Sequence, residues 1–309
     1  MKKDFYYNSQ DKCTKIHAIE WIPDGKIKAI LQISHGMVEF IDRYDEFARF
    51  LNEHGYYVVG NDHLGHGESV SCEDHYGYFC EKSGNKCVIK DIRHLYKITK
   101  KKYPDVPYFL MGHSMGSFLI RQYLIKYSSG ISGVIIMGTG DQPPLLVKGG
   151  KLLCKAIAEI KGWEYRSPLV NKLVIGNYNK KFSPCRTSAD WLSRNEENVD
   201  SYLKNPWCTF VFTLNAFYNM FRGIETLHQK NYFEDIPKTL PVFFVSGIQD
   251  PVGDFGKGVL QVYGRFKENG MKDVSIKLYK NDRHEILNEC DRELVFKDLL
   301  EWMEQKRCL

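Results

Sequence analysis

Short apolar runs of strand length alternate with stretches of helical periodicity along most of this chain. The runs predict buried β-strands at residues 27–33, 56–59, 108–111, 133–137, 242–245 and 274–278. Between them, apolar residues recur at helical spacing, as in 44–51 before Gly55 and again in 88–99. This order predicts an α/β fold with a mostly parallel central sheet that is flanked by helices on both faces.

The alternation lapses between residues 141 and 226, where helical patterns, turn residues and aromatics replace the apolar runs. A strand pattern flanked by Pro237 and Pro241 follows. The sequence therefore predicts one α/β core, formed by 1–140 and 227–309, with a helical cap inserted at 141–226. The 309 residues allow this arrangement, and 43% hydrophobic and 26% charged residues are typical of a folded globular protein.

Charge and cysteine content exclude several function classes. The 43 Lys and Arg and 38 Asp and Glu give a net charge of +5 that is spread over the chain, whereas nucleic-acid-binding proteins concentrate basic charge on one face. The nine cysteines include no C-x-x-C pair, so neither a zinc knuckle nor a redox dithiol is expected. Scattered thiols are typical of a reducing compartment, and residues 1–15 lack the apolar stretch of a signal peptide. No apolar run approaches the roughly eighteen residues of a membrane-spanning helix, so we expect a cytoplasmic protein.

The sharpest local motif is GHSMG at residues 112–116, which has the G-x-S-x-G pattern. It follows the apolar run 108–111 and opens the helical stretch that begins at Met115, which is the strand-turn-helix setting that this motif requires. The alternative is an ordinary Gly-rich turn, which would not need to lie between a strand and a helix. We predict that Ser114 is a nucleophile in a strained turn and that the Met115 backbone N–H is a donor to an oxyanion.

A serine nucleophile needs a base, and the base needs an acid that holds its tautomer. In this fold the three residues follow the order Ser, Asp, His. Asp250 lies just beyond the strand 242–245 and His284 just beyond the strand 274–278, where sites in parallel sheets gather. The alternatives are Asp254 or Asp235 as the acid and His228 as the base.

Two polar loops follow the early strands. In the first, a glycine after His35 lets the backbone approach a substrate, so the Met37 N–H is the predicted second oxyanion donor and His35 is expected to brace the loop. The second loop, 61–69, contains His63 and His66. Their spacing is compatible with metal binding, but the sequence offers no third ligand and we expect them to brace the loop as well. Neither a metal nor an organic cofactor is expected.

Together these motifs resemble the α/β-hydrolase superfamily, specifically its monoacylglycerol lipase and lysophospholipase branch, a serine aminopeptidase-like family. The resemblance spans nearly the whole chain and rests on HGM at 35–37, D-x-x-G-H-G-x-S at 62–69, GHSMG at 112–116, Asp250 and His284. It implies an α/β-hydrolase fold with a helical cap over an acyl pocket, and it implies site roles as follows: Ser114 nucleophile, Asp250 acid, His284 base, and the amides of Met37 and Met115 as the oxyanion hole. Family members often carry histidine after the glutamate of the oxyanion loop, where this chain has Phe40.

The predicted cap contains a basic amphipathic helix at 145–160. At 100° per residue, one face carries Leu145, Leu146, Leu152, Leu153, Ala156, Ile157 and Ile160, and Lys148, Lys151 and Lys155 lie opposite. This pattern predicts either peripheral docking on an anionic lipid surface, such as the inner face of a membrane, or packing on the core with solvated lysines. The segment 206–212 is an acyl-tunnel lining or the cap's own core. The pocket candidates are His35, Phe40, His113, Trp207 and Phe210.

We therefore predict a serine hydrolase that cleaves carboxylic esters of single acyl chains, monoacylglycerol or lysophospholipid, through an acyl-enzyme on Ser114. Its expected partner is a small-molecule lipid ester and not a nucleic acid, and the oligomeric state stays open. One alternative is an aminopeptidase or amidase, in which Glu196, Glu197 and Asp200 would bind a free amino terminus. Another is a non-catalytic ligand-binding module on the same fold, against which the complete Ser, Asp and His set argues.

Overall fold

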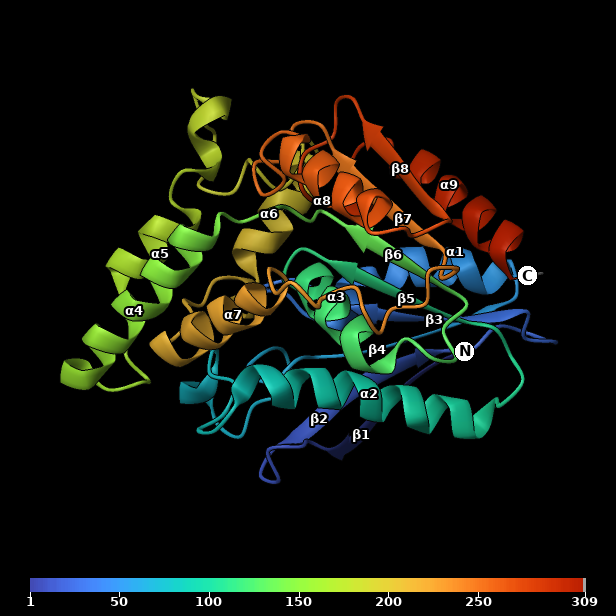
Figure 1. Cartoon of the computed structure of the whole chain (residues 1–309), viewed down its shortest axis with the longest axis horizontal. Coiled ribbons are helices and arrows are strands. Elements are labelled where there is room, and N and C mark those ends of the chain that lie inside the picture. Colours follow the sequence, from blue (N-terminus) through green and yellow to red (C-terminus); the bar gives the residue numbers. More distant parts are fainter. Residues whose placement is uncertain (308–309) are drawn as a thin grey trace.

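The computed structural model describes residues 1–307 and has a central eight-stranded sheet between two layers of helices (Figure 1). The strand order is β1-β2-β4-β3-β5-β6-β7-β8. The strands are β1 (Lys2–Asn8), β2 (Lys15–Trp21), β3 (Ala29–Ser34), β4 (Tyr56–Asn61), β5 (Tyr108–His113), β6 (Gly133–Met137), β7 (Val242–Gly247) and β8 (Val274–Tyr279). From β3 to β8 all neighbours are parallel, and β2 is antiparallel to both β1 and β4. The predicted fold class is confirmed.

Every predicted strand is present, as β3 to β8, and all but β3 begin at the predicted residue. The hairpin of β1 and β2 is not among the predicted strands. β1 is an edge strand that pairs with β2 alone, with Lys2 opposite Trp21. Because an edge strand can expose polar side chains, such as those of Lys3 and Asp4, it lacks the apolar run that indicates a buried parallel strand.

The helices divide between the two faces of the sheet. Over the described residues they are α1 (Asp45–Glu53), α2 (Gly84–Lys102), α3 (Met115–Tyr127), α4 (Pro144–Lys161), α5 (Pro168–Ile175), α6 (Glu196–Lys204), α7 (Leu214–Thr226), α8 (Lys257–Glu268) and α9 (Arg292–Lys306). Short 3₁₀ turns occupy Ile41–Tyr44, Glu73–His75, Tyr178–Phe182, Pro206–Cys208 and Ile286–Asn288. The core on one face includes α2, α3 and α8, and the core on the other includes α1 and α9.

Four helices, α4 to α7, lie between β6 and β7 in the chain, which is the segment that the sequence predicts as a cap. In Figure 1, α4 and α5 lie at the edge of the molecule, far from the N-terminus. Among residues 1–307, no helix is both long enough and apolar enough to cross a membrane.

Helix α4 packs on α7 through a different face from the apolar face predicted for packing. Its buried residues are Val147, Cys154 and Ala158. A Cβ at Gly150 would lie 2.7 Å from Cζ of Phe221 in α7, so the two helices meet closely there. Most of the apolar face that the sequence identified points to solvent: Leu145, Leu146, Leu152 and Ile160 are 82%, 70%, 64% and 82% exposed. The lysines are also divided, because Lys151 contacts Glu225 of α7 at 2.6 Å while Lys148 and Lys155 stay exposed.

Candidate active site

Ser114 occupies the turn between β5 and α3 in a conformation that few residues adopt. Its φ of 52° and ψ of −120° lie outside the regions that a side chain favours. A Cβ at Gly112 would lie 2.4 Å from the Gly116 carbonyl oxygen, and a Cβ at Gly116 would lie 2.0 Å from that of Ser34. Both glycines are therefore required by close packing. Met115 is the first residue of α3, so its N–H is among those without a partner inside the helix.

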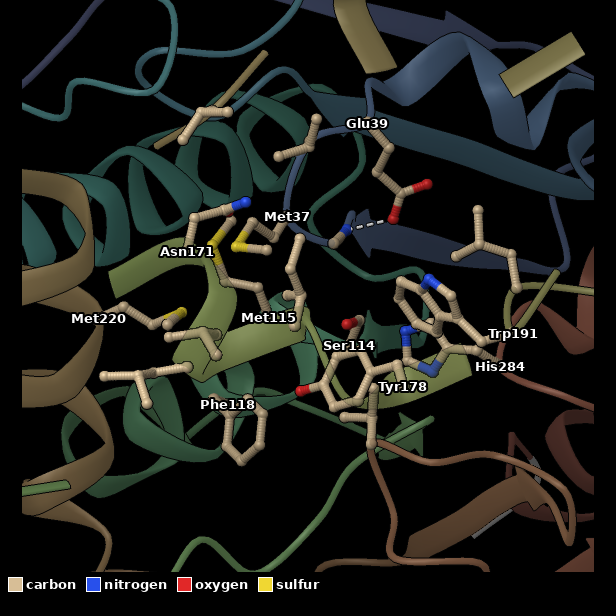
Figure 2. Close-up of a pocket in the computed structure, with 18 of the residues that line it drawn as sticks. Met37, Glu39, Ser114, Met115, Phe118, Asn171, Tyr178, Trp191, Met220 and His284 are labelled. Carbon is tan, nitrogen blue, oxygen red and sulfur yellow. Dashed lines mark hydrogen bonds between the residues drawn. The ribbon is translucent and has the colours of Figure 1, made fainter. Parts of the chain in front are cut away.

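The predicted base and acid are hydrogen-bonded to each other. His284 Nδ1 lies 2.9 Å from Asp250 Oδ2, and the two side chains are 2% and 0% exposed. The Asp250 carboxylate also accepts from the Val252 N–H at 2.8 Å and from the Ser246 hydroxyl at 3.3 Å. Because Nδ1 donates to the carboxylate, Nε2 of His284 is the ring atom left to face a nucleophile. Figure 2 shows the Ser114 hydroxyl beside the His284 ring.

The alternative residues lie elsewhere. His228 Nδ1 lies 3.3 Å from the Arg265 guanidinium, and its Nε2 lies 3.9 Å from Asp141. Of the three acids that the sequence offers, Asp250 is the one that forms a hydrogen bond with His284. The structure thus brings together Asp250 and His284, the acid and the base that the order Ser, Asp, His along the chain favours.

The loop after β3 presents the Met37 amide, and His35 fixes its orientation. His35 Nδ1 lies 2.8 Å from the Gly36 carbonyl oxygen, which can only accept a hydrogen bond. Nε2 of the same ring accepts from the His63 N–H at 2.9 Å, so the ring is the neutral Nδ1–H tautomer. In a trans peptide the Met37 N–H points opposite to the Gly36 carbonyl, away from His35. A Cβ at Gly36 would lie 3.0 Å from Cβ of Ser114, so this peptide lies beside that residue.

Burial keeps the surrounding histidines neutral. The ring centroid of His35 lies 4.2 Å from that of His63 and 5.2 Å from that of His66. Burial lowers the pKa of all three, to about 3 for His66. His63 Nε2 lies 2.9 Å from the Ser34 hydroxyl at the end of β3. These contacts fit loop bracing, which is the role expected from the sequence.

Glu39 joins this oxyanion loop to the turn that carries the predicted nucleophile. Its Oε1 accepts from the Gly36 N–H (Figure 2), from the Tyr44 hydroxyl at 3.0 Å and from His113 Nδ1 at 3.1 Å. His113 Nε2 lies 3.2 Å from the His284 carbonyl oxygen, so each ring nitrogen faces an acceptor, an arrangement that favours the protonated ring. Burial opposes both charges, but the mutual hydrogen bond and attraction raise the pKa of His113 and hold the pKa of Glu39 well below its usual range.

Arg43 extends the same network to α6. Its guanidinium donates two hydrogen bonds to Glu285, at 2.6 and 2.7 Å, and lies 3.1 Å from Glu39 Oε2. Asn198 of α6 accepts from Arg43 at 3.2 Å and donates to Glu285 at 2.7 Å, and the Tyr202 ring lies 5.0 Å from the guanidinium. Because Glu285 directly follows the predicted base, buried charges connect the oxyanion loop, the base and the predicted cap.

Most of the predicted residues converge on one cavity of about 730 Å³, a size typical of small-molecule sites, which are roughly 300–1,000 Å³. Its wall includes Met37, His113, Ser114, Met115, Phe210 and His284. Apolar side chains of α4, α5 and α7 form a large part of it: Leu145, Leu146, Val147, Leu153, Leu173, Val174, Ile175, Met220, Phe221 and Ile224. In Figure 2, Ser114 lies between the rings of His284 and Trp191 on one side and the side chains of Met37 and Met220 on the other.

Three pocket candidates are absent from the described lining of this cavity. His35 is fully buried behind the oxyanion loop. Phe40 and Trp207 pack against each other, with ring centroids 5.0 Å apart. The backbone of Phe40 is extended, with φ of −148° and ψ of 163°, so its side chain points away from the side that Glu39 occupies. The described lining of the cavity thus does not include these three predicted pocket residues.

Other residues of the cavity were not singled out from the sequence. Tyr178, Trp191 and Tyr202 come from the segment between β6 and β7, and Glu285 follows His284. The Trp191 ring lies 5.1 Å from that of His284. No periodic pattern marks Trp191 as a neighbour of a histidine so distant in sequence, and only the folded chain reveals the contact.

A carboxylate cluster beside the His284 loop already has a cationic partner. Within residues 1–307, Asp282, Glu289 and Asp291 have the spacing of metal ligands. The Arg194 guanidinium lies 2.9 Å from Asp282, 3.3 Å from Glu289 and 2.6 Å from Asp291. Glu289 also accepts from the Arg283 N–H at 2.9 Å, so this cluster braces the loop that carries His284.

Comparison with known proteins agrees with this geometry. A family model described as serine aminopeptidase, S33 matches residues 25–291. The chain belongs to this family. It is 28% identical to a monoglyceride lipase of Mus musculus, over 87% of this chain and 79% of that protein, and 26% identical to a monoacylglycerol lipase of Mycolicibacterium smegmatis, over 92% and 90%.

A solved structure of an esterase has the same fold. A highly thermostable carboxyl esterase from Bacillus coagulans, solved in complex with glycerol, superimposes with a TM-score of 0.92 at 27% identity and covers 99% of both chains. The α/β-hydrolase resemblance drawn from the motifs is confirmed. These similarities support an ester-cleaving serine hydrolase and do not favour the amidase and non-catalytic alternatives.

Proposed function

We propose that this hydrolase cleaves esters of single acyl chains, monoacylglycerol or lysophospholipid, through an acyl-enzyme on Ser114. The observation that carries the proposal is the meeting, at one cavity, of Ser114, a hydrogen-bonded pair of His284 and Asp250, and an extended apolar wall. Relatives named monoglyceride and monoacylglycerol lipases support this substrate class.

In the proposed reaction, Ser114 Oγ attacks the ester carbonyl while His284 Nε2 accepts its proton. Asp250 holds the Nδ1–H tautomer and stabilises the imidazolium that forms. The N–H groups of Met37 and Met115 donate to the oxyanion of the tetrahedral intermediate. His284 then protonates the leaving alkoxide and, in the second half, activates a water molecule that releases the fatty acid and regenerates Ser114. The chemistry needs no cofactor.

The carboxylates that an aminopeptidase would need lie away from this cavity. Asp200 forms an ion pair with Arg186 at 2.7 Å, and Glu196 lies 3.7 Å from the same guanidinium. Neither these two nor Glu197 belongs to the described lining of the cavity. The described lining does include the carboxylates of Glu39 and Glu285, but these are already paired with His113 and Arg43, so neither is free to bind a charged amino terminus.

We also propose that residues 141–226 act as a cap that docks on lipid surfaces. The cap patch consists of the exposed large apolar side chains of α4, α5 and their connection: Leu145, Leu146, Leu152, Ile160, Trp163, Tyr165, Leu169 and Leu173. Three of them, Leu145, Leu146 and Leu173, also line the cavity, so the patch is continuous with the way into the site. A single-chain lipid could therefore pass from a membrane to Ser114 without exposing its chain to water.

Labelling with a fluorophosphonate probe tests the nucleophile. We expect the folded protein to be labelled on Ser114 and Ser114→Ala to lose both labelling and ester hydrolysis. Monoacylglycerols, lysophospholipids, short nitrophenyl esters and aminoacyl amides then separate the substrate classes. Labelling at another residue, or preference for the amides, would overturn the proposal.

Vesicle binding tests the cap patch. Leu152→Glu with Ile160→Glu should weaken binding to phosphatidylserine-containing vesicles at least about tenfold, because the removal of two large apolar contacts costs several kcal/mol. Neither side chain belongs to the described cavity lining, so hydrolysis of a short soluble ester should be retained. Leu260→Glu with Leu294→Glu is the matched control, since both residues are half exposed on α8 and α9. Equal loss in the two double variants would contradict docking through the cap.

We further propose that the protein works in a reducing compartment, the cytoplasm. Eight cysteines of the described residues are unpaired thiols, and Cys308 lies outside those residues. Detection of a fluorescent fusion outside the cytoplasm would contradict this localisation.

A further inference from the structure

Two cysteines that are separated in sequence meet where α2 begins. Cys80 Sγ lies 3.2 Å and Cys87 Sγ lies 3.8 Å from the same acceptor, the carbonyl oxygen of Lys82. The two Sγ atoms thus lie around one carbonyl group, close enough for each thiol to shift the pKa of the other. Cys80 is 8% exposed, whereas Cys87 is only partly buried. A buried thiol thus shares a carbonyl acceptor with one that solvent can reach.

The pair is electrostatically unequal. The Cys80 thiol favours a thiolate on its neighbour and lowers the pKa of Cys87 to about 7, while Cys87 and burial raise the pKa of Cys80. The more accessible thiol of the pair, Cys87, is therefore the one that ionises more readily. Lys90 adds to the stabilisation of the thiolate, and Asp11 opposes it.

We propose that Cys80 and Cys87 form a redox pair that hydrogen peroxide converts to a disulfide. The Cys87 thiolate attacks one peroxide oxygen, the O–O bond breaks, and the departing hydroxide takes up a proton to give water and a Cys87 sulfenic acid. The Cys80 sulfur then attacks the Cys87 sulfur, the S–O bond breaks, and a second water leaves with the Cys80 proton. Two thiols are oxidised to one disulfide and one peroxide is reduced to two waters.

The pair is placed where a cross-link would hold the cavity wall. The Cys80 carbonyl accepts from Asn215 Nδ2 of α7 at 2.8 Å, and the Thr213 N–H donates to the Gly77 carbonyl at 2.9 Å. Phe210 of the neighbouring segment lines the cavity. A disulfide would tie the loop that anchors the start of α7 to the first turns of α2. The spacing of the cysteines in sequence does not predict this pair, because their contact depends on the fold of the intervening turn.

Peptide mapping of the folded wild-type protein after treatment with dilute hydrogen peroxide tests the proposal. We expect the intact mass to fall by two hydrogen atoms, and the non-reduced digest to contain a peptide that joins Cys80 to Cys87 and disappears on reduction. Oxidation of Cys87 to sulfinic acid without this peptide, or cross-links that involve other cysteines instead, would overturn the proposal. The wild-type result does not depend on whether a variant folds.

Two variants separate the roles of the thiols. In Cys80→Ser the Cys87 sulfenic acid should persist and react with a 1,3-diketone probe, whereas Cys87→Ser should leave Cys80 unlabelled. Cys72→Ser removes an exposed thiol of the preceding loop and should keep the cross-link of the wild type. Labelling of Cys80 in Cys87→Ser would reverse the assigned order and contradict the mechanism.

Discussion

At the scale of single residues, hydrogen bonds of buried side chains decide which way backbone groups point. His35 donates to the Gly36 carbonyl, and this contact turns the Met37 N–H away from the His35 ring, in a peptide that lies beside Ser114. The His113 ring lies between two acceptors, with Nδ1 3.1 Å from Glu39 and Nε2 3.2 Å from the His284 carbonyl oxygen. Burial lowers the pKa of His35, whereas despite burial the contact with Glu39 raises that of His113, so the surroundings favour opposite charge states in the two rings.

Substitution of His35 tests this orientation. His35→Leu removes the donor to Gly36, so the Met37 amide is free to rotate, and we expect kcat to fall by about 10²–10³-fold with little change in KM, because an oxyanion donor acts in the transition state. In His35→Asn the amide nitrogen takes the place of Nδ1, and we expect at least about tenfold recovery of kcat.

Steady-state kinetics with a short soluble ester measures both constants, and circular dichroism shows whether the variants are folded. A merely structural role would lower the activity of both variants by loss of folded protein. Equal kcat values in the two variants, or a raised KM with unchanged kcat, would contradict the assigned role of His35.

At the scale of elements, a buried ion network joins parts that come from distant segments. Arg43, from the 3₁₀ turn before α1, contacts Glu285 beyond β8 and Asn198 of α6. The side chains of Arg43 and Glu285 are 10% and 4% exposed. Burial opposes both charges, but their mutual attraction raises the pKa of Arg43 and lowers that of Glu285. The attachment of α6 to the core therefore depends on a buried ion pair, in which the loss of either charge would leave the other buried without its partner.

A double-mutant cycle in urea measures that dependence. Arg43→Met leaves Glu285 without its cation and Glu39 with His113 alone, and we expect the free energy of unfolding to fall by about 3–5 kcal/mol. Adding Glu285→Gln removes one stranded charge, so the double variant should be more stable than Arg43→Met alone. If the double variant loses as much free energy of unfolding as the two single variants together, the two side chains do not depend on each other.

The sequence predicted elements better than it predicted which way they face. The strands β3 to β7 are buried at every residue and therefore appear as mostly apolar runs, whereas the edge strands β1 and β8 expose one side and carry polar residues such as Lys3 and Lys277. In α4 the helical period identified which residues share a face, but not whether that face meets the core. Small residues such as Gly150 and Cys154 let α7 approach the opposite side, and this left Leu152 exposed.

At the scale of the whole molecule, the predicted triad positions depend on topology while the cavity wall depends on contacts. The carboxyl ends of β5, β7 and β8 lie near one another in the sheet, so Ser114, Asp250 and His284 could be proposed from their order along the chain. No comparable rule places Trp191 against His284 or Phe40 against Trp207. Those contacts are set by packing of α4 to α7 over the sheet, which local patterns do not encode.

The cluster of neutral histidines behind the oxyanion loop gives the molecule an acid-sensitive contribution to stability. His66 has a pKa of about 3 in the folded protein, against about 6.5 in an unfolded chain. Between these values the unfolded chain binds a proton that the folded chain does not, so the contribution is complete above about pH 6.5 and is lost as the pH falls. His17 behaves in the opposite way, because despite its burial the hydrogen bond and charge of Asp62 raise its pKa to about 9.

Urea unfolding at two pH values isolates this contribution. The free energy of unfolding of the wild type, minus that of His66→Phe, should fall by about 2 kcal/mol from about pH 7 to about pH 5, because only the wild type carries the titrating group. The other ionisable groups cancel in this difference. For His17→Gln the corresponding difference should rise slightly over the same interval and fall only as the pH increases toward about 9. If the His66 difference is constant with pH, His66 is not held neutral by burial, and the oxyanion loop is more open to water than its packing implies.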